Sequence, residues 1–180
     1  MSFDVAERFL ERSRYYLGTE YPAKLRAAVL ALPPDRLWWR ANQASNSAGN
    51  LLLHLAGNVR QWVVSGIGGA PDTRARDAEF AADGGMGSEA LLAHLDAALR
   101  EVDEVLARLT PASLGETRRI QGRETTVFSA LYHVVEHFSG HTGQVILIAK
   151  MHAPGAIRFY ESAGGLAHPT FLGEGRSDVE

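Results

Sequence analysis

The sequence predicts an all-α protein, an up-and-down four-helix bundle with one long connection between its second and third helices. Apolar residues recur at helical spacing over most of the chain, prolines end these stretches, and one glycine-rich connection separates two of them. A length of 180 residues suits a single domain. We expect residues 1–155 to form the bundle and residues 156–180 to be a surface-wrapping or partly disordered tail of the same domain.

The first helix carries apolar side chains at helical spacing close to the start of the chain, where Ser2 is a suitable N-cap. Pro22 is expected to kink or interrupt this helix, because proline lacks the N–H that a helical turn requires. The helical pattern then resumes over residues 24–32. Pro33 and Pro34 end it.

The second helix is predicted over residues 48–67, after a connector with turn chemistry at residues 35–47. Asn46 or Ser47 supplies its N-cap. Apolar residues cover most of the circumference of this helix, which is typical of a helix at the centre of a bundle rather than at its edge.

A glycine-rich segment with mixed charges, residues 66–87, connects the second helix to the third. We expect a short helical turn around residues 77–82 within it. Connections of this length without regular structure are usually functional or mobile. The third helix is predicted over residues 89–109, with Ser88 as its cap and Pro111 ending it.

The fourth helix is predicted over residues 126–151 and is ended by Pro154. A small irregular hairpin is expected just before it, over residues 118–126. The fourth helix combines a strongly apolar composition with a cluster of histidines, which makes it the first place to look for chemistry.

Composition narrows the possible functions. The formal net charge is −3, which argues against nucleic acid as a partner because a phosphate backbone selects a basic surface. No cysteine is present, so any metal or catalytic site uses nitrogen and oxygen groups. The first twenty residues carry charges throughout and predict neither a signal peptide nor a membrane span. We therefore expect a cytoplasmic protein that binds no membrane.

Four of the seven histidines lie inside the two most apolar helices. In the fourth helix, a spacing of four residues advances the side chains by only about 40° around the axis, so one stripe contains His133, His137, His141 and Gln144. The second helix repeats the same offsets with Asn50, His54, Asn58 and Gln61. Each of these two apolar helices thus carries one polar stripe.

If the two stripes face each other, they either satisfy each other's hydrogen bonds or bind a metal ion. Burying these groups without partners would cost about 1–3 kcal/mol each. Two histidines four residues apart offer nitrogen ligands on adjacent turns, and a third from the neighbouring helix completes a triad that leaves positions for water or substrate. The residues alone leave both interpretations open. In either case His54 is expected to face the fourth helix.

Two strings, GNLLLHLAGNVRQW at residues 49–62 and HVVEHFSGHTGQVILIAK at residues 133–150, resemble the DinB-like (DinB/YfiT-like) superfamily of bacterial proteins. The resemblance extends over residues 38–50 and 68–80 and implies a four-helix bundle, often dimeric, with a divalent metal ion held by three histidines. On this chain those ligands fall on His54, His137 and His141.

Supporting roles around the ligands are predicted for His133, Asn50, Asn58 and Gln144. Zinc or nickel is the expected ion, since imidazole suits both. The superfamily implies a metal-dependent thiol S-transferase that uses a low-molecular-weight thiol and acts on a small molecule, in a homodimer. A metal-dependent hydrolase and a non-catalytic metal-binding stress protein are the alternatives, and no catalytic residue is assigned.

Other assignments explain the sequence less well. The string from His133 to His137 also fits the inverted zinc-protease motif H-x-x-E-H, with Glu136 as general base. That class needs a glutamate ligand far downstream, and this chain is too short for one. A di-iron carboxylate bundle needs Glu-x-x-His pairs, which do not occur in this chain. Arg74 and Arg76 in the long connection are candidates for holding an anionic substrate.

Overall fold

The computed structural model describes residues 4–171, which are mostly helical with two small strand pairs. The α-helices are α1 (Val5–Tyr15), α2 (Tyr21–Ala31), α3 (Ala48–Val59), α4 (Arg76–Ala81), α5 (Ser88–Leu106) and α6 (Val127–His152). The strands are β1 (Thr117–Ile120), β2 (Arg123–Thr126), β3 (Tyr160–Ala163) and β4 (Leu166–Pro169). None of the described helices is long and apolar enough to cross a membrane.

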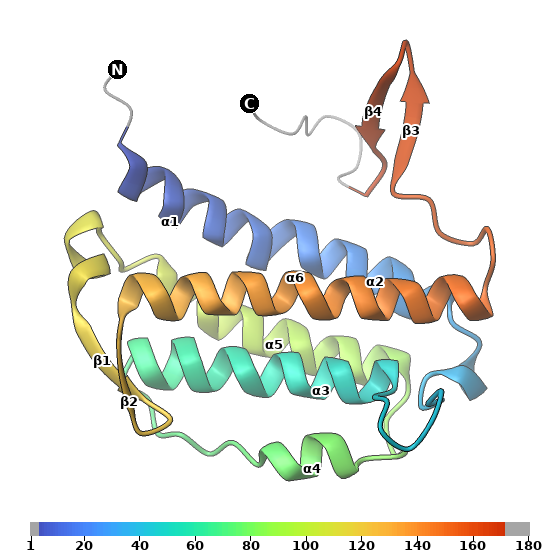
Figure 1. Ribbon diagram of the computed structural model, residues 1–180, viewed down its shortest axis with the longest axis horizontal. Coiled ribbons are helices and arrows are strands. Elements are labelled where there is room, and N and C mark those ends of the chain that lie inside the picture. The colour runs from blue at the N-terminus through green and yellow to red at the C-terminus, as the bar shows by residue number, and fades with distance from the viewer. Residues whose placement is uncertain (1–3, 172–180) are drawn as a thin grey trace.

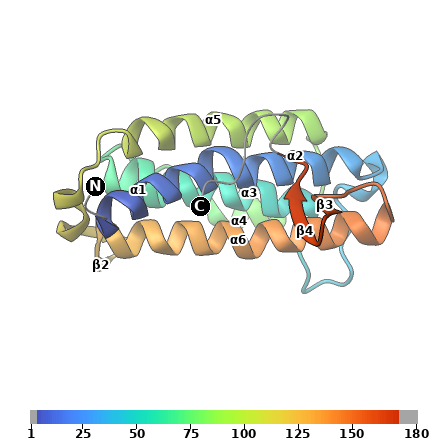
Figure 2. The ribbon, with the colours of Figure 1, turned by 90° about the horizontal axis from the view of Figure 1, so that it is seen from above.

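The long helices lie side by side around a common apolar core (Figures 1 and 2). Helices α2 and α3 each contact both α5 and α6, and the short helix α4 covers the outer side of α3. Nearly all of α3 is buried, as predicted for a central helix. This packing places the polar stripe of α3 beside that of α6.

The irregularity expected at Pro22 takes the form of a π-helical turn rather than a break. Residues Tyr16–Glu20 form this turn, and helical backbone continues on both sides of it. Tyr21 donates its N–H to the carbonyl of Tyr16, five residues back. A proline in a regular α-helix removes one bond and clashes with the carbonyl four residues before it. A turn bonded five residues apart relaxes both demands, so the helix accommodates Pro22.

The N-caps in the structure agree only in part with those predicted from the sequence. Ser47 caps α3 in a reciprocal box with Asn50, as one of the two predicted caps. Asp4 caps α1, and the predicted cap Ser2 lies outside the described residues. At α5 the prediction was wrong, because Ser88 is the first helical residue and the N-cap is Gly87, which offers no side chain.

The predicted hairpin before α6 is present as β1 and β2, joined by the two-residue turn Gln121-Gly122. Both turn residues have positive φ, 52° and 76°, as a type I′ turn requires. The second helix continues beyond Val59 as a π-helical segment, Arg60–Ile67, and β1 packs against this segment. The hairpin therefore closes one end of the space between α3 and α6.

The predicted tail contains a second hairpin, β3–β4, which projects from the helices in Figure 1. Lys24 on α2 donates to the hydroxyl of Tyr160 at 3.3 Å and so attaches this hairpin to the helices. Residues 172–180, the rest of the predicted tail, lie outside the described residues.

Candidate metal centre

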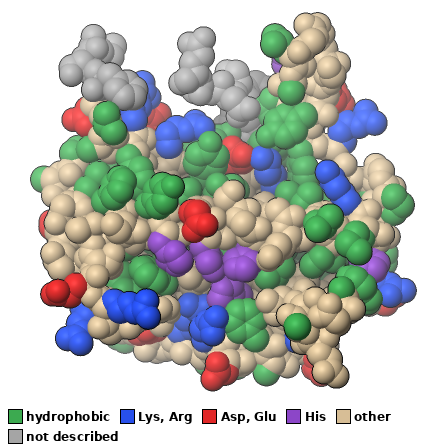
Figure 3. All heavy atoms as spheres, viewed as in Figure 1, with side chains coloured by type: hydrophobic (Ala, Val, Ile, Leu, Met, Phe, Trp, Pro, Cys, Tyr) green, Lys and Arg blue, Asp and Glu red, His purple; other side chains and the backbone are tan. Residues whose placement is uncertain are grey.

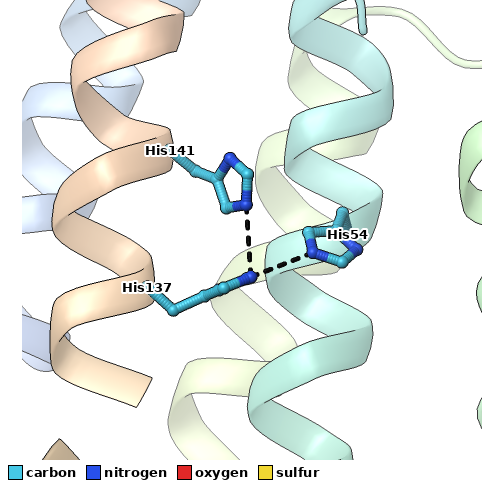
Figure 4. A group of neighbouring side chains, drawn as sticks. All are labelled: His54, His137 and His141. Atoms are coloured by element: carbon cyan, nitrogen blue, oxygen red, sulfur yellow. Dashed lines mark hydrogen bonds between the residues drawn. The ribbon is translucent and has the colours of Figure 1, made fainter. Parts of the chain in front are cut away.

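Three histidines meet between α3 and α6 (Figure 4). His54 on α3 faces α6, as predicted, and its Nε2 atom lies 3.0 Å from Nε2 of His137. Nε2 of His141, one turn further along α6, lies 3.2 Å from the same atom. Within residues 4–171 this is the one group of three or more histidine or acidic side chains close enough to hold a metal ion.

The spacing of these nitrogens fits a metal centre. Imidazole nitrogens about 2.0–2.1 Å from a tetrahedral zinc ion lie about 3.3 Å from one another. The two Nε2 distances given above agree with that separation. Three nitrogen ligands also match the preference of zinc and nickel for imidazole. The donor set therefore fits a divalent transition-metal ion.

The partners of two of the rings orient their Nε2 atoms toward the same point. Nδ1 of His54 lies 2.9 Å from Oε2 of Glu79, and Nδ1 of His141 lies 2.7 Å from Oε1 of Gln144. The Gln144 oxygen can only accept, so in His141 the hydrogen lies on Nδ1 and Nε2 keeps its lone pair. Nδ1 of His54 lies between the Glu79 carboxylate, which accepts, and Nη2 of Arg74 at 3.0 Å, which donates.

Burial keeps the imidazoles of His137 and His141 neutral. His54 is 5% exposed, and His137 and His141 are half-buried. Burial, together with the neighbouring imidazoles of His141 and His54, lowers the pKa of His137 to about 3. Burial also lowers the pKa of His141. Neutral imidazole is the form that binds metal, so these shifts favour a metal site.

The lowered pKa values predict that the metal-free protein loses stability in mild acid. Below pH 6.5 the unfolded chain binds protons at His137 and His141. In the folded chain the same imidazoles stay neutral until the pH falls to their lowered pKa values. We expect the free energy of unfolding to fall between pH 7 and pH 5, by up to about 1.4 kcal/mol per pH unit for each such histidine. Urea unfolding at the two pH values measures this, and His137→Gln should reduce the slope. A stability that does not change with pH would contradict the prediction.

Glu79, on α4, is a site residue that the sequence did not reveal. Its carboxylate accepts from Nδ1 of His54 and forms a two-point ion pair with Arg74, at 2.7 Å and 2.8 Å. Burial raises the pKa of Glu79, but the hydrogen bonds from Arg74 and His54 outweigh it and hold the pKa below its usual value. Glu79 thus stays charged and positions His54, the role that carboxylates often serve behind metal-bound histidines.

Gly57 makes room for this carboxylate. A Cβ atom at Gly57, one turn after His54 on α3, would overlap the Oε1 atom of Glu79. Any larger residue there would push Glu79 away from His54. The sequence contains both Gly57 and Glu79, but nothing in it shows that they are in contact. Only the folded structure identifies Glu79 as a site residue.

The predicted supporting residues divide into two groups. Gln144 bonds to His141, and His133 lies next to His137 with 5.5 Å between ring centroids. Asn50, in contrast, bonds to groups other than the three histidines. Its Nδ2 atom donates to backbone carbonyls at the end of α4, to that of Glu79 at 2.9 Å and to that of Ala82 at 2.7 Å. Asn50 therefore attaches α4 to α3 instead of contacting a ligand.

A cavity of about 390 Å³ opens beside the triad. His54 and His137 form part of its wall, with His133, Asn58 and Trp62 around them. Figure 3 shows histidine side chains (purple) gathered in the middle of the face that is seen in Figure 1. The candidate centre is therefore accessible to small molecules.

A comparison with known families finds one that covers most of the chain. The model of a family described as a protein of unknown function (DUF1572) matches residues 4–159, which include all six α-helices and the three histidines. No curated protein matches the chain.

Proposed function

The chain belongs to DUF1572, a family of proteins of unknown function, and we propose that this member is a DinB-like four-helix bundle with a catalytic metal centre. In this proposal His54, His137 and His141 hold one divalent ion, zinc or nickel. The favoured reaction is the transfer of a low-molecular-weight thiol to a small electrophilic substrate. The observation that carries the proposal is the convergence of three Nε2 atoms at the wall of an open cavity.

The number of ligands favours catalysis over a purely structural role. Structural zinc sites are closed by four protein ligands, whereas catalytic sites have three and keep one position for water or substrate. Within the described chain, three histidines converge and no fourth histidine or carboxylate joins them. His54 and His137 also border the cavity, so the three nitrogens lie next to the space that a substrate would occupy.

The protein's own residues orient the histidine rings and give small molecules access to the centre. Glu79 and Gln144 hold the rings of His54 and His141 with Nε2 toward the centre. The cavity beside His137 admits the two reactants. A bound zinc-type ion supplies the chemistry of lowering the pKa of a thiol, so that the thiolate is available at neutral pH.

Metal analysis of the untagged protein is the first test, and we expect about one divalent ion per chain at neutral pH. Thiol conjugation with a monochlorobimane-type electrophile is the second test, run with mycothiol, bacillithiol and glutathione. We expect one of these thiols to react faster with the protein than without it, and His141→Ala to lose the acceleration. Binding of metal without conjugation of any thiol would instead favour a hydrolase or a non-catalytic protein. Absence of metal after reconstitution would remove the whole proposal.

A further inference from the structure

The cavity beside the triad is strongly basic. Three arginines line it, Arg74, Arg76 and Arg123, and no aspartate or glutamate is among its lining residues. The carboxylate of Glu79 neutralises the charge of Arg74 and also contacts His54. Two positive charges therefore remain without compensation at the cavity wall, at the start of α4 and at the start of β2.

These two arginines have no carboxylate partner among residues 4–171. Arg76 packs over the ring of Phe80, 4.8 Å from its centroid, and that ring in turn lies 4.6 Å from the ring of His54. Arg76 is thus held near the metal centre by an aromatic contact that leaves its hydrogen-bond donors free. Arg123 approaches from the β1–β2 hairpin. Arginine side chains in this situation bind carboxylate and phosphate groups at two points.

Buried polar groups on the same wall also lack partners. Asn58 is 3% exposed, and its Oδ1 atom makes no hydrogen bond within the described chain. Nε1 of Trp62, one turn further along, is buried and unpaired as well. Unsatisfied buried groups are rare in proteins and call for an explanation. Both residues belong to the cavity lining, and the amide of Asn58 and the indole N–H of Trp62 are hydrogen-bond donors that suit a ligand oxygen.

The hairpin that carries Arg123 is held at the cavity. Gln121 has a backbone φ of 52°, in the left-handed region that residues other than glycine rarely adopt. Its Nε2 donates to Oε1 of Gln61 at 2.7 Å, and Arg74 donates to the same oxygen at 2.9 Å. Gln61 therefore joins the hairpin, the second helix and the long connection. This network sets the position of the Arg123 backbone before any ligand arrives.

We propose that this cavity binds a small organic anion through a carboxylate or phosphate group held by Arg76 and Arg123. The inference deepens the proposed function by naming the class of its substrate. Figure 3 shows basic side chains (blue) next to the histidines on the same face of the molecule. An anion bound there would have the rest of its structure next to His54 and His137, where the proposed reaction takes place.

Calorimetric titration of the metal-free protein with succinate and with inorganic phosphate tests the proposal. Arg76→Gln and Arg123→Gln are each expected to weaken binding about tenfold, as the loss of one charge-assisted hydrogen bond implies. The control is Arg108→Gln, which removes the same charge from an exposed position outside the cavity and should bind like the unaltered protein. A preference for succinate identifies a carboxylate substrate, and a preference for phosphate a phosphorylated one.

Several results would overturn the proposal. They are the absence of binding for both probes, unchanged binding in both cavity variants, and an equal loss in the Arg108→Gln control. Metal content is measured on the same samples, and the two cavity variants should keep it, since neither arginine belongs to the triad. Failure of the metal site and failure of the anion site are therefore seen separately. Circular dichroism of each variant confirms that the exposed substitutions leave the fold intact.

Discussion

Replacing His141 with alanine is expected to abolish tight binding of a divalent ion. The Nε2 atom of His141 is one of three that converge, and two nitrogens cannot hold the ion as three do. Changes behind the ligands typically reduce affinity about 10–100-fold, and loss of a ligand should cost more. His54→Ala is expected to have the same effect. Titration of the purified variants with zinc measures both.

His133→Ala is the matched control, because it removes a histidine from the same stripe of α6. His133 lies beside His137 and Trp62 but is not one of the three that converge. This variant should keep about one ion per chain. The inverted-protease interpretation requires the opposite order, with His133 essential and His141 dispensable. If His133→Ala loses the ion while His141→Ala keeps it, the assignment of the ligands is wrong.

Glu79→Ala is expected to cause the largest loss of stability. The side chain of Arg74 is 3% exposed and would be left buried without its carboxylate partner. Breaking a buried pair in this way costs about 3–5 kcal/mol, because the remaining charge stays uncompensated. The affinity for zinc should also fall about 10–100-fold, since His54 loses the group that orients it. Urea unfolding of the metal-free protein and zinc titration measure the two effects.

Two further variants separate charge from position. The double variant Arg74→Ala with Glu79→Ala should be less unstable than the sum of its single changes, because no charge is left unpaired. Gly57→Ala keeps both charges but displaces Glu79, and should lower the affinity for zinc. Additive losses of stability in the double variant would show that the two charges are not coupled. Full zinc affinity in Gly57→Ala would show that Glu79 does not position His54.

The helical elements were predictable because their signals are local. The spacing of apolar residues, the prolines and the cap at Ser47 act within a few turns of the chain. The four-residue interval in α6 also places His137 and His141 on one face without reference to any other element. Local sequence patterns therefore determined most of the helices, the hairpin before α6 and the histidine stripe.

The meeting of the stripes was decided by tertiary packing. Helix α3 lies against α6, so that His54 completes the triad. The long connection returns along α3, where Gly57 leaves space for Glu79. No local pattern specifies such a contact, because Glu79 lies 25 residues from His54.

In the basic cavity, too, the sequence predicted the residue types and tertiary packing decided their contacts. The sequence singled out Arg74 and Arg76 in the long connection, but it could not tell which of them is neutralised. Packing pairs Arg74 with Glu79 and brings Arg123 from the hairpin to the wall of the cavity beside the triad. The sequence by itself thus determined the helices and the chemical types available for a site. Only the tertiary structure decided which charges are compensated, because compensation depends on distance in space and not on distance along the chain.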